Sequence, residues 1–261
     1  MTILKHELKT GRNQLIIWAA AVSFLLVICV LIYPEMSSQM GEISDTFAQM
    51  GGFTQAFGMD KVNFGEFLGF FGVECGNILG LGGAFFAALI GISALAKEEK
   101  EHTAEFLLTH PISRSKILTE KLLAVVVQLV IFNAAVIAVT GATILIIGEE
   151  PDTKTLALLY LSYFLMQIET AAVSFGISAF LKRGAIGVGI GISAVFYFMN
   201  IISNLTENAE ILKYFTPFGY TDSADIIVDN SIDPGYLAAG AGIAFAGIVC
   251  SYVKYLKKDI S

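Results

Sequence analysis

Charged side chains are scarce in this sequence. Asp, Glu, Lys and Arg make up 15% of its 261 residues, whereas soluble globular domains contain about 25%. Hydrophobic residues account for 55%, and they gather in long blocks. So few charges cannot cover the surface of a fold of this size in water. The composition therefore excludes an ordinary soluble domain and favours a membrane protein.

Residues and motifs for catalysis are also scarce. No glycine-rich loop ends in Gly-Lys-Ser/Thr, the sequence whose amides and lysine hold nucleotide phosphates. The H-E-x-x-H motif of zinc proteases is absent. His6-Glu7 begins such a motif, but Thr10 occupies the position of the second histidine. All three histidines lie outside the apolar blocks, so no serine within those blocks has a histidine as its base. We therefore expect no enzyme, no catalytic residue and no resident metal or cofactor.

Cysteine is rare as well. The three cysteines, Cys29, Cys75 and Cys250, lie in or at the edge of apolar blocks. Three is an odd number, and a free cysteine in such a block packs as a small hydrophobic residue. We expect no disulfide framework.

The long apolar blocks have the length of membrane-spanning helices. A helix crosses the bilayer core with about 20 apolar residues, whereas the strands of a membrane barrel would alternate apolar and polar residues. Because these blocks do not alternate, we predict an all-α integral membrane protein formed by a single domain over residues 1–261. We place its six spans at residues 14–33, 70–96, 119–148, 155–181, 185–203 and 236–256.

The basic residues predict how these spans are oriented. Lys and Arg are enriched in the cytoplasmic loops of membrane proteins. With the N-terminus in the cytoplasm, all 16 of them except Lys61, Lys154 and Lys213 lie on the cytoplasmic side. Six spans then place both termini in the cytoplasm, as a multi-pass protein of the cell membrane.

Three further segments lie before or between the spans. Residues 1–13 place apolar and basic side chains on different sides of a helix, so we expect an interfacial helix on the inner leaflet; a frayed basic tail is the alternative. Residues 34–69 and 204–235 are polar and acidic. We expect two external loops there, each able to carry short helices.

Small residues recur every four positions in two of the spans. This spacing makes a smooth ridge that lets helix backbones approach closely in lipid. We expect the ridges to pack within the chain, although either could also serve an interface between subunits. The residues are Gly72, Gly76, Gly80 and Ala84 in the second span and Gly187 and Gly191 in the fifth.

Polar side chains interrupt the third and fourth spans. Glu169 lies well inside the fourth span, where a charged group costs about 2.5–3.5 kcal/mol on insertion scales. Such a residue either lines a pathway or changes conformation, or else is a protonated or hydrogen-bonded packing residue, and both interpretations stay open. The other polar residues of interest are Gln128, Asn133, Gln167 and Thr170.

The stretch at 97–116 reads KEEKEHTAEFLLTHPISRSK and separates the second and third spans. Its apolar and charged residues fall on different sides of a short helix. It is too charged to enter lipid, and its Phe-Leu-Leu run is suited to a groove on a cytoplasmic partner. A solvated hairpin that only returns the chain is the alternative.

The same stretch resembles the first cytoplasmic loop of ABC-2 type transporter permeases. The likeness consists of an acidic run followed by T-x-E-Φ-L-L-x-x-P-Φ-S-R, with Φ apolar. The residues that carry it are Glu98, Glu99, Thr103, Glu105, Phe106, Leu107, Leu108, Pro111, Ser113 and Arg114. His102 departs from the pattern, because many members have glycine before the threonine. Six spans and the amphipathic N-terminal segment also fit the family.

The resemblance implies a transport subunit without its own nucleotide-binding site. In that family the loop is a coupling helix that binds a separate cytoplasmic ABC ATPase, which holds the ATP and Mg²⁺. A second permease chain, identical or related, completes the pathway, and the usual activity is export in bacteria. The compact chain favours a drug or an antimicrobial peptide as substrate. The alternative is a scaffold or sensor subunit that docks a cytoplasmic partner without transport.

Overall fold

The computed structural model describes residues 2–48, 51–59, 61–100, 113–181 and 185–257. Within these ranges six helices are long and apolar enough to cross a membrane, so the six predicted spans are confirmed. They belong to α1 (Thr2–Ala48), α4 (Gly76–Lys100), α6 (Arg114–Ile147), α7 (Thr153–Ser178), α8 (Ala185–Leu205) and α10 (Pro234–Leu256). The short elements are α2 (Gly52–Ala56), α3 (Phe67–Phe70), the π-helical turn η1 (Phe71–Cys75), the 3-10 helix η2 (Glu207–Phe215) and α9 (Ser223–Asp229).

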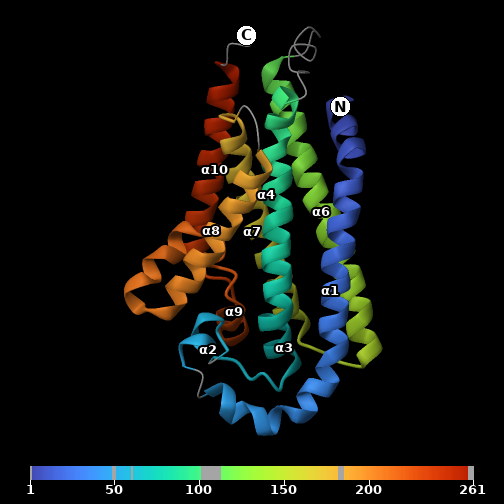
Figure 1. Ribbon diagram of the computed structural model, residues 1–261, viewed down its shortest axis with the longest axis vertical. Coiled ribbons are helices and arrows are strands. Elements are labelled where there is room, and N and C mark those ends of the chain that lie inside the picture. Colours follow the sequence, from blue (N-terminus) through green and yellow to red (C-terminus); the bar gives the residue numbers. More distant parts are fainter. Residues whose placement is uncertain (1, 49–50, 60, 101–112, 182–184, 258–261) are drawn as a thin grey trace.

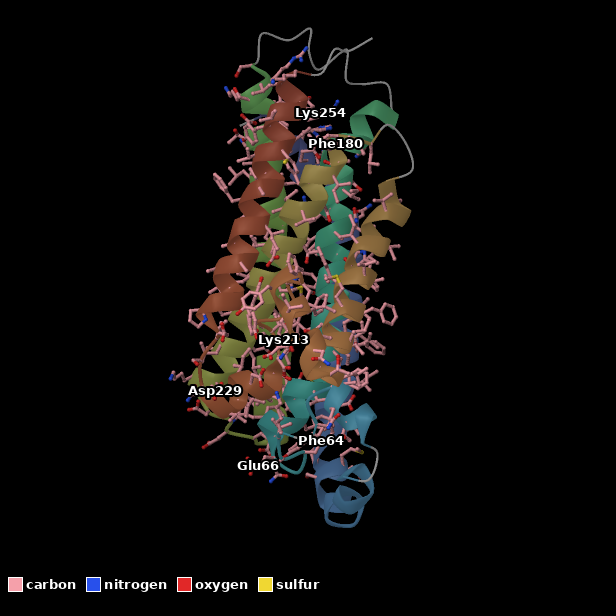
Figure 2. All side chains as sticks on the ribbon, turned by 90° about the vertical axis from the view of Figure 1, so that its left-hand side faces the viewer. Phe64, Glu66, Phe180, Lys213, Asp229 and Lys254 are labelled. Atoms are coloured by element: carbon pink, nitrogen blue, oxygen red, sulfur yellow. The ribbon has the colours of Figure 1, made fainter. Side chains whose placement is uncertain are left out.

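The long helices form one bundle (Figure 1). The start of α1, the end of α4, the start of α6 and the end of α10 lie together at one end, which we call the inner end. The short helices lie toward the opposite, outer end. Figure 2 places Lys254 and Phe180 near the inner end, where the ammonium lies 5.6 Å from the centre of the aromatic ring. Both flanks of the 97–116 loop thus share an end with the chain termini.

The N-terminal segment differs from the prediction. Residues 2–13 are helical, but they continue into the first span without a break, so they form no separate interfacial helix. No proline interrupts the helix before Pro34, and α1 also runs on through that proline to Ala48. A proline inside a helix removes one backbone hydrogen bond and bends the axis, and the last part of α1 turns across the outer end of the bundle (Figure 1).

Helices α4 and α7 form the centre of the bundle. In the most apolar stretch of α4, 67% of the residues are buried within the chain, against 11% in α10. The helices approach so closely that a Cβ at Gly91 would lie 2.5 Å from the carbonyl oxygen of Ala171, and one at Gly83 would overlap Gln167. Association in lipid depends on such close packing, because lipid tails are as apolar as the helices.

The predicted ridge on α4 packs within the chain. A Cβ at Gly76 would overlap the Tyr163 hydroxyl, and one at Gly80 would lie 3.3 Å from the Tyr163 ring. Gly72 precedes α4, in η1, and lies against α9, where a Cβ would be 2.8 Å from Ile227. Ala84 is fully buried. The ridge therefore gives α7 and the outer segments access to the α4 backbone.

The predicted ridge on α8 does not pack within the chain. A Cβ added at Gly187 or Gly191 would meet nothing within 4 Å. The contact with α4 is made instead by Gly189, where a Cβ would lie 3.0 Å from Ile92 and 3.3 Å from the carbonyl oxygen of Ala88. The two predicted glycines lie on roughly the opposite side of α8 from Gly189, because helical positions two residues apart differ by about 200°.

The predicted external loop 204–235 is only partly external. Thr216, Phe218 and Tyr220 are each at most 4% exposed. The Phe218 ring lies against Gly80 of α4, and the Thr216 hydroxyl donates to the carbonyl of Phe196 in α8. The chain therefore enters the bundle after η2, and it stays packed against the bundle into α9, where Ala224 and Ile226 are at most 2% exposed. We call residues 216–222 the re-entrant segment.

The close approach of α4 and α7 predicts opposite results for two glycine substitutions. Gly91→Ala must push the helices apart and should lower stability by about 1–3 kcal/mol. Gly141→Ala in α6 meets open space and gains up to about 1 kcal/mol of helix propensity, so its stability should hold or rise. Thermal unfolding in detergent measures both. Equal midpoints for the two variants would contradict this packing.

Candidate functional site

Most of the predicted partner-binding residues lie outside the described part of the chain. These are Thr103, Glu105, Phe106, Leu107, Leu108 and Pro111, and the side chains of Glu98 and Glu99 also lie outside it. Ser113 is at the N-cap of α6, but its side chain makes no capping hydrogen bond. The Arg114 guanidinium lies 3.3 Å from the carbonyl oxygen of Leu256. This residue therefore contacts the last turn of α10, where a cation is favourable.

The five predicted intramembrane polar residues lie in separate places. Asn133 of α6 donates to the Gln167 side chain of α7 at 2.6 Å. Gln128 lies instead against α1, where its Oε1 would be 2.7 Å from a Cβ on Gly11. Thr170 directs its hydroxyl to the sulfur of Met166 on its own helix. All five are at most 6% exposed. The structure thus brings together Asn133 and Gln167 alone, and they form no continuous polar path.

Glu169 is closed off by two residues that the sequence analysis missed. The Tyr220 hydroxyl donates to Glu169 Oε2 at 2.8 Å, and Gly240 of α10 packs so close that a Cβ there would overlap the carboxyl group. Glu169 is 3% exposed, and its Oε1 has no hydrogen-bond partner. Three elements therefore converge on this buried carboxyl group: α7, the re-entrant segment and α10. The nearness of Tyr220 depends on the path of the loop, which residue spacing does not reveal.

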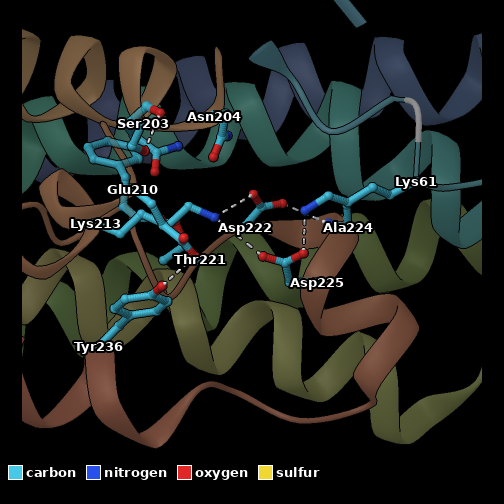
Figure 3. Close-up of polar contacts among 12 residues, drawn as sticks. Lys61, Ser203, Asn204, Glu210, Lys213, Thr221, Asp222, Ala224, Asp225 and Tyr236 are labelled. Carbon is cyan, nitrogen blue, oxygen red and sulfur yellow. Dashed lines mark hydrogen bonds and ion pairs between the residues drawn. The ribbon is translucent and has the colours of Figure 1, made fainter. Parts of the chain in front are cut away.

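A charged cluster lies around Asp222, the last residue of the re-entrant segment (Figure 3). The ammonium of Lys213, a side chain only 8% exposed, lies 3.8 Å from Asp222 and 3.6 Å from Asp225. Lys61 binds Asp225 at 2.7 Å. Burial, together with the nearby Asp225 carboxylate, raises the pKa of Asp222, and the two lysines oppose this shift. The cluster joins the loop after α2 to η2 and α9.

A polar cavity of about 520 Å³ opens beside this cluster. It is lined by both lysines and Asp222, by Glu210, and by amide and hydroxyl side chains from the ends of α2 and α8. A smaller cavity of about 50 Å³ shares Asn204 and Asp222 with it and extends to Tyr163 and Asn200. The outer end therefore offers both signs of charge and many hydrogen-bonding groups to a polar molecule.

Residues 1–260 match the family model described as "ABC-2 family transporter protein". The search of curated proteins finds no match. The family match extends over nearly the whole chain.

The bond between Tyr220 and Glu169 is tested by removing the tyrosine hydroxyl. Tyr220→Phe leaves the buried Oε2 without its donor, so we expect unfolding to require about 1–3 kcal/mol less. In the same background Glu169→Gln should cost less than it does alone, with a coupling of at least about 0.5 kcal/mol. Chemical denaturation in detergent measures all three variants.

Tyr214→Phe is the matched control. It removes the hydroxyl of a ring that is 46% exposed, and it should change stability by less than about 0.5 kcal/mol. Strictly additive effects of Tyr220→Phe and Glu169→Gln on the free energy of unfolding would contradict a stabilising bond between the two side chains.

Proposed function

Because the chain belongs to the ABC-2 family of transporter proteins and is a membrane-spanning component of an ABC transporter, we propose that it is the permease half of an ATP-driven exporter. A second copy or a related permease completes the pathway. A separate cytoplasmic ABC ATPase binds ATP and Mg²⁺ and supplies the energy. The inner end of the bundle faces the cytoplasm, as the distribution of basic residues indicates.

The observation that carries this proposal is the position of the 97–116 loop. Its sequence has the charged, amphipathic character of a coupling helix, and its flanks lie at the inner end beside the chain termini (Figure 1). One flank is α4, the most buried of the spans. A displacement of the loop therefore acts directly on the helix against which α7 and α8 pack.

Glu169 has a conformational role in this proposal. Its side chain is covered by Tyr220 and Gly240 and lines neither of the two outer cavities. For the pathway to open on the outside, the re-entrant segment must change its contacts, and the Tyr220–Glu169 bond opposes that change. The remaining polar pair, Asn133 and Gln167, joins α6 to α7.

The substrate we propose is a drug-like molecule or a peptide. The outer cavity supports a polar or amphipathic molecule, because its lining combines lysines, acids and amides. The modest external segments leave room for a release vestibule but add no separate binding domain to it.

The test uses the chain together with an ABC ATPase encoded beside it. Leu107→Asp places a charge in the apolar run of the loop, where burying a leucine contributes roughly 1.5–3 kcal/mol. We expect the variant to lose binding of the ATPase and the ATP hydrolysis of the complex, with its own thermal stability unchanged. Copurification and phosphate release in lipid nanodiscs measure this, and Leu107→Met is the matched control.

Two outcomes would contradict the proposal. One is unchanged ATPase binding and hydrolysis in Leu107→Asp. The other is a wild-type complex that hydrolyses ATP but moves neither a cationic dye nor a cationic peptide across proteoliposomes. The second outcome would favour the scaffold or sensor subunit.

A further inference from the structure

The first two turns of α6 hold three other helices through polar contacts. The first of these turns, which begins at Arg114, is the end of the 97–116 stretch itself, so these turns are the first part of α6 to respond when the stretch moves. They reach α1 and α4 on one side and α10 on the other. The contacts are Glu120 with the amides of Ile3 and Leu4, Lys121 with Glu7 and the carbonyl of Ala94, Thr119 with the Tyr252 hydroxyl, and Arg114 with the carbonyls of Tyr255 and Leu256.

Lys121 is the most buried part of this junction. Its side chain is 2% exposed, and its ammonium lies 2.6 Å from a carboxylate oxygen of Glu7 and 2.8 Å from the carbonyl oxygen of Ala94. A buried ammonium is tolerated only with such partners. A single side chain therefore joins α6 to both α1 and α4, and loss of either partner would be costly.

Glu120 also binds the start of α1 and so adds a second contact between α6 and α1. Its Oε2 accepts from the backbone amides of Ile3 at 3.0 Å and Leu4 at 3.2 Å. These amides belong to the first turn of α1, where no carbonyl of the same helix is available to them. With Glu7 bound to Lys121 one turn later, the first two turns of α1 are attached to α6 by adjacent residues.

The Lys121 contact to α4 spans the two flanks of the loop. Ala94 lies in α4, which ends at Lys100, and Lys121 lies in α6, which begins at Arg114. Any displacement that separates the end of α4 from the start of α6 must stretch the bond from Lys121 to Ala94. The bond thus lies directly across the base of the loop.

The junction also has room to rearrange. A cavity of about 80 Å³ lies between α1, α4 and α6 and is lined by Glu7, Ala94, Lys97, Lys121 and Gln128. A polar cavity of this size accepts water, which can replace a partner of the ammonium during a movement. Solid packing would have made the contact rigid.

We propose that Lys121 is a positioning residue for energy coupling: it makes α1 and α4 follow α6 when the ATPase displaces the loop. This inference rests on the proposed function. In this inference the Lys121–Glu7–Ala94 contact transmits the movement of the loop to α1. The loop is not next to α1 in the sequence. Without the ammonium, ATP hydrolysis continues and the outer end no longer responds.

The test compares hydrolysis with movement of the outer end. Spin labels at Glu35→Cys and Asp229→Cys, in a chain whose three native cysteines are replaced, report the distance between α1 and α9 in the complete complex. Wild type should change this distance between the nucleotide-free and the vanadate-trapped state. In Lys121→Met hydrolysis should stay within about twofold of wild type, while the distance change is lost.

Three variants keep the result interpretable. Lys121→Arg retains a cation with several donors and should recover most of the distance change. Lys9→Met removes an exposed lysine from α1 and should behave as wild type. Glu7→Gln, which alters a more accessible partner, should reduce the distance change and serves if Lys121→Met does not fold.

Parallel loss of hydrolysis and movement in both Lys121→Met and Glu7→Gln would overturn the inference, because it would indicate a general structural role. An unchanged distance response in these variants would overturn it as well. If the wild-type chain bound no ATPase at all, the proposed function would be refuted, and this inference with it.

Discussion

The close approach of α4 and α7 is the constraint on which the rest of the structure depends. Lipid gives no hydrophobic drive for helix association, so the bundle relies on backbone contact at small residues. Gly83 and Gly91 allow this contact, and α4 becomes a central helix that the other elements surround. Because interiors are densely packed, α4 cannot shift at its inner end without moving α7. The 97–116 stretch begins at that inner end, so in the proposed function a displacement there reaches the outer segments through α4.

In the described part of the chain, several polar side chains inside the bundle lie at junctions between helices. Lys121 joins α6 to α1 and α4 near the inner end, and Asn133 joins α6 to α7 farther along the same helix. Glu169 holds the re-entrant segment through Tyr220, and Lys213 lies between Asp222 and Asp225 at the outer end. Each of these contacts is strong only when its partners are in place. A set of such contacts stabilises one arrangement of the helices, and a transporter that alternates between arrangements must exchange them.

The sequence predicted what depends on length and composition. The six spans follow from apolar blocks, and the packing of Gly72, Gly76 and Gly80 follows from their spacing. Residues 2–13 are continuous with the first span and do not form a separate helix. The amphipathic residues at 1–13 did not reveal this, because Glu120 and Lys121, which bind the segment, lie far away in the sequence. The same limit applies to Tyr220, which meets Glu169 from 51 residues away, and to Gly187 and Gly191, whose spacing does not say which side of α8 meets α4. The function of the loop was inferred from a motif, and its residues 101–112 lie outside the described part of the chain.

The central claim is that the loop between α4 and α6 lies in the cytoplasm, where an ATPase can reach it. Cysteine accessibility in intact cells tests this most directly, with the three native cysteines replaced and a single cysteine placed at Glu105 or, on the opposite side, at Glu150. A membrane-impermeant maleimide should label Glu150→Cys in intact cells and Glu105→Cys only after permeabilisation. Labelling of Glu105→Cys in intact cells, with Glu150→Cys protected, would contradict the account.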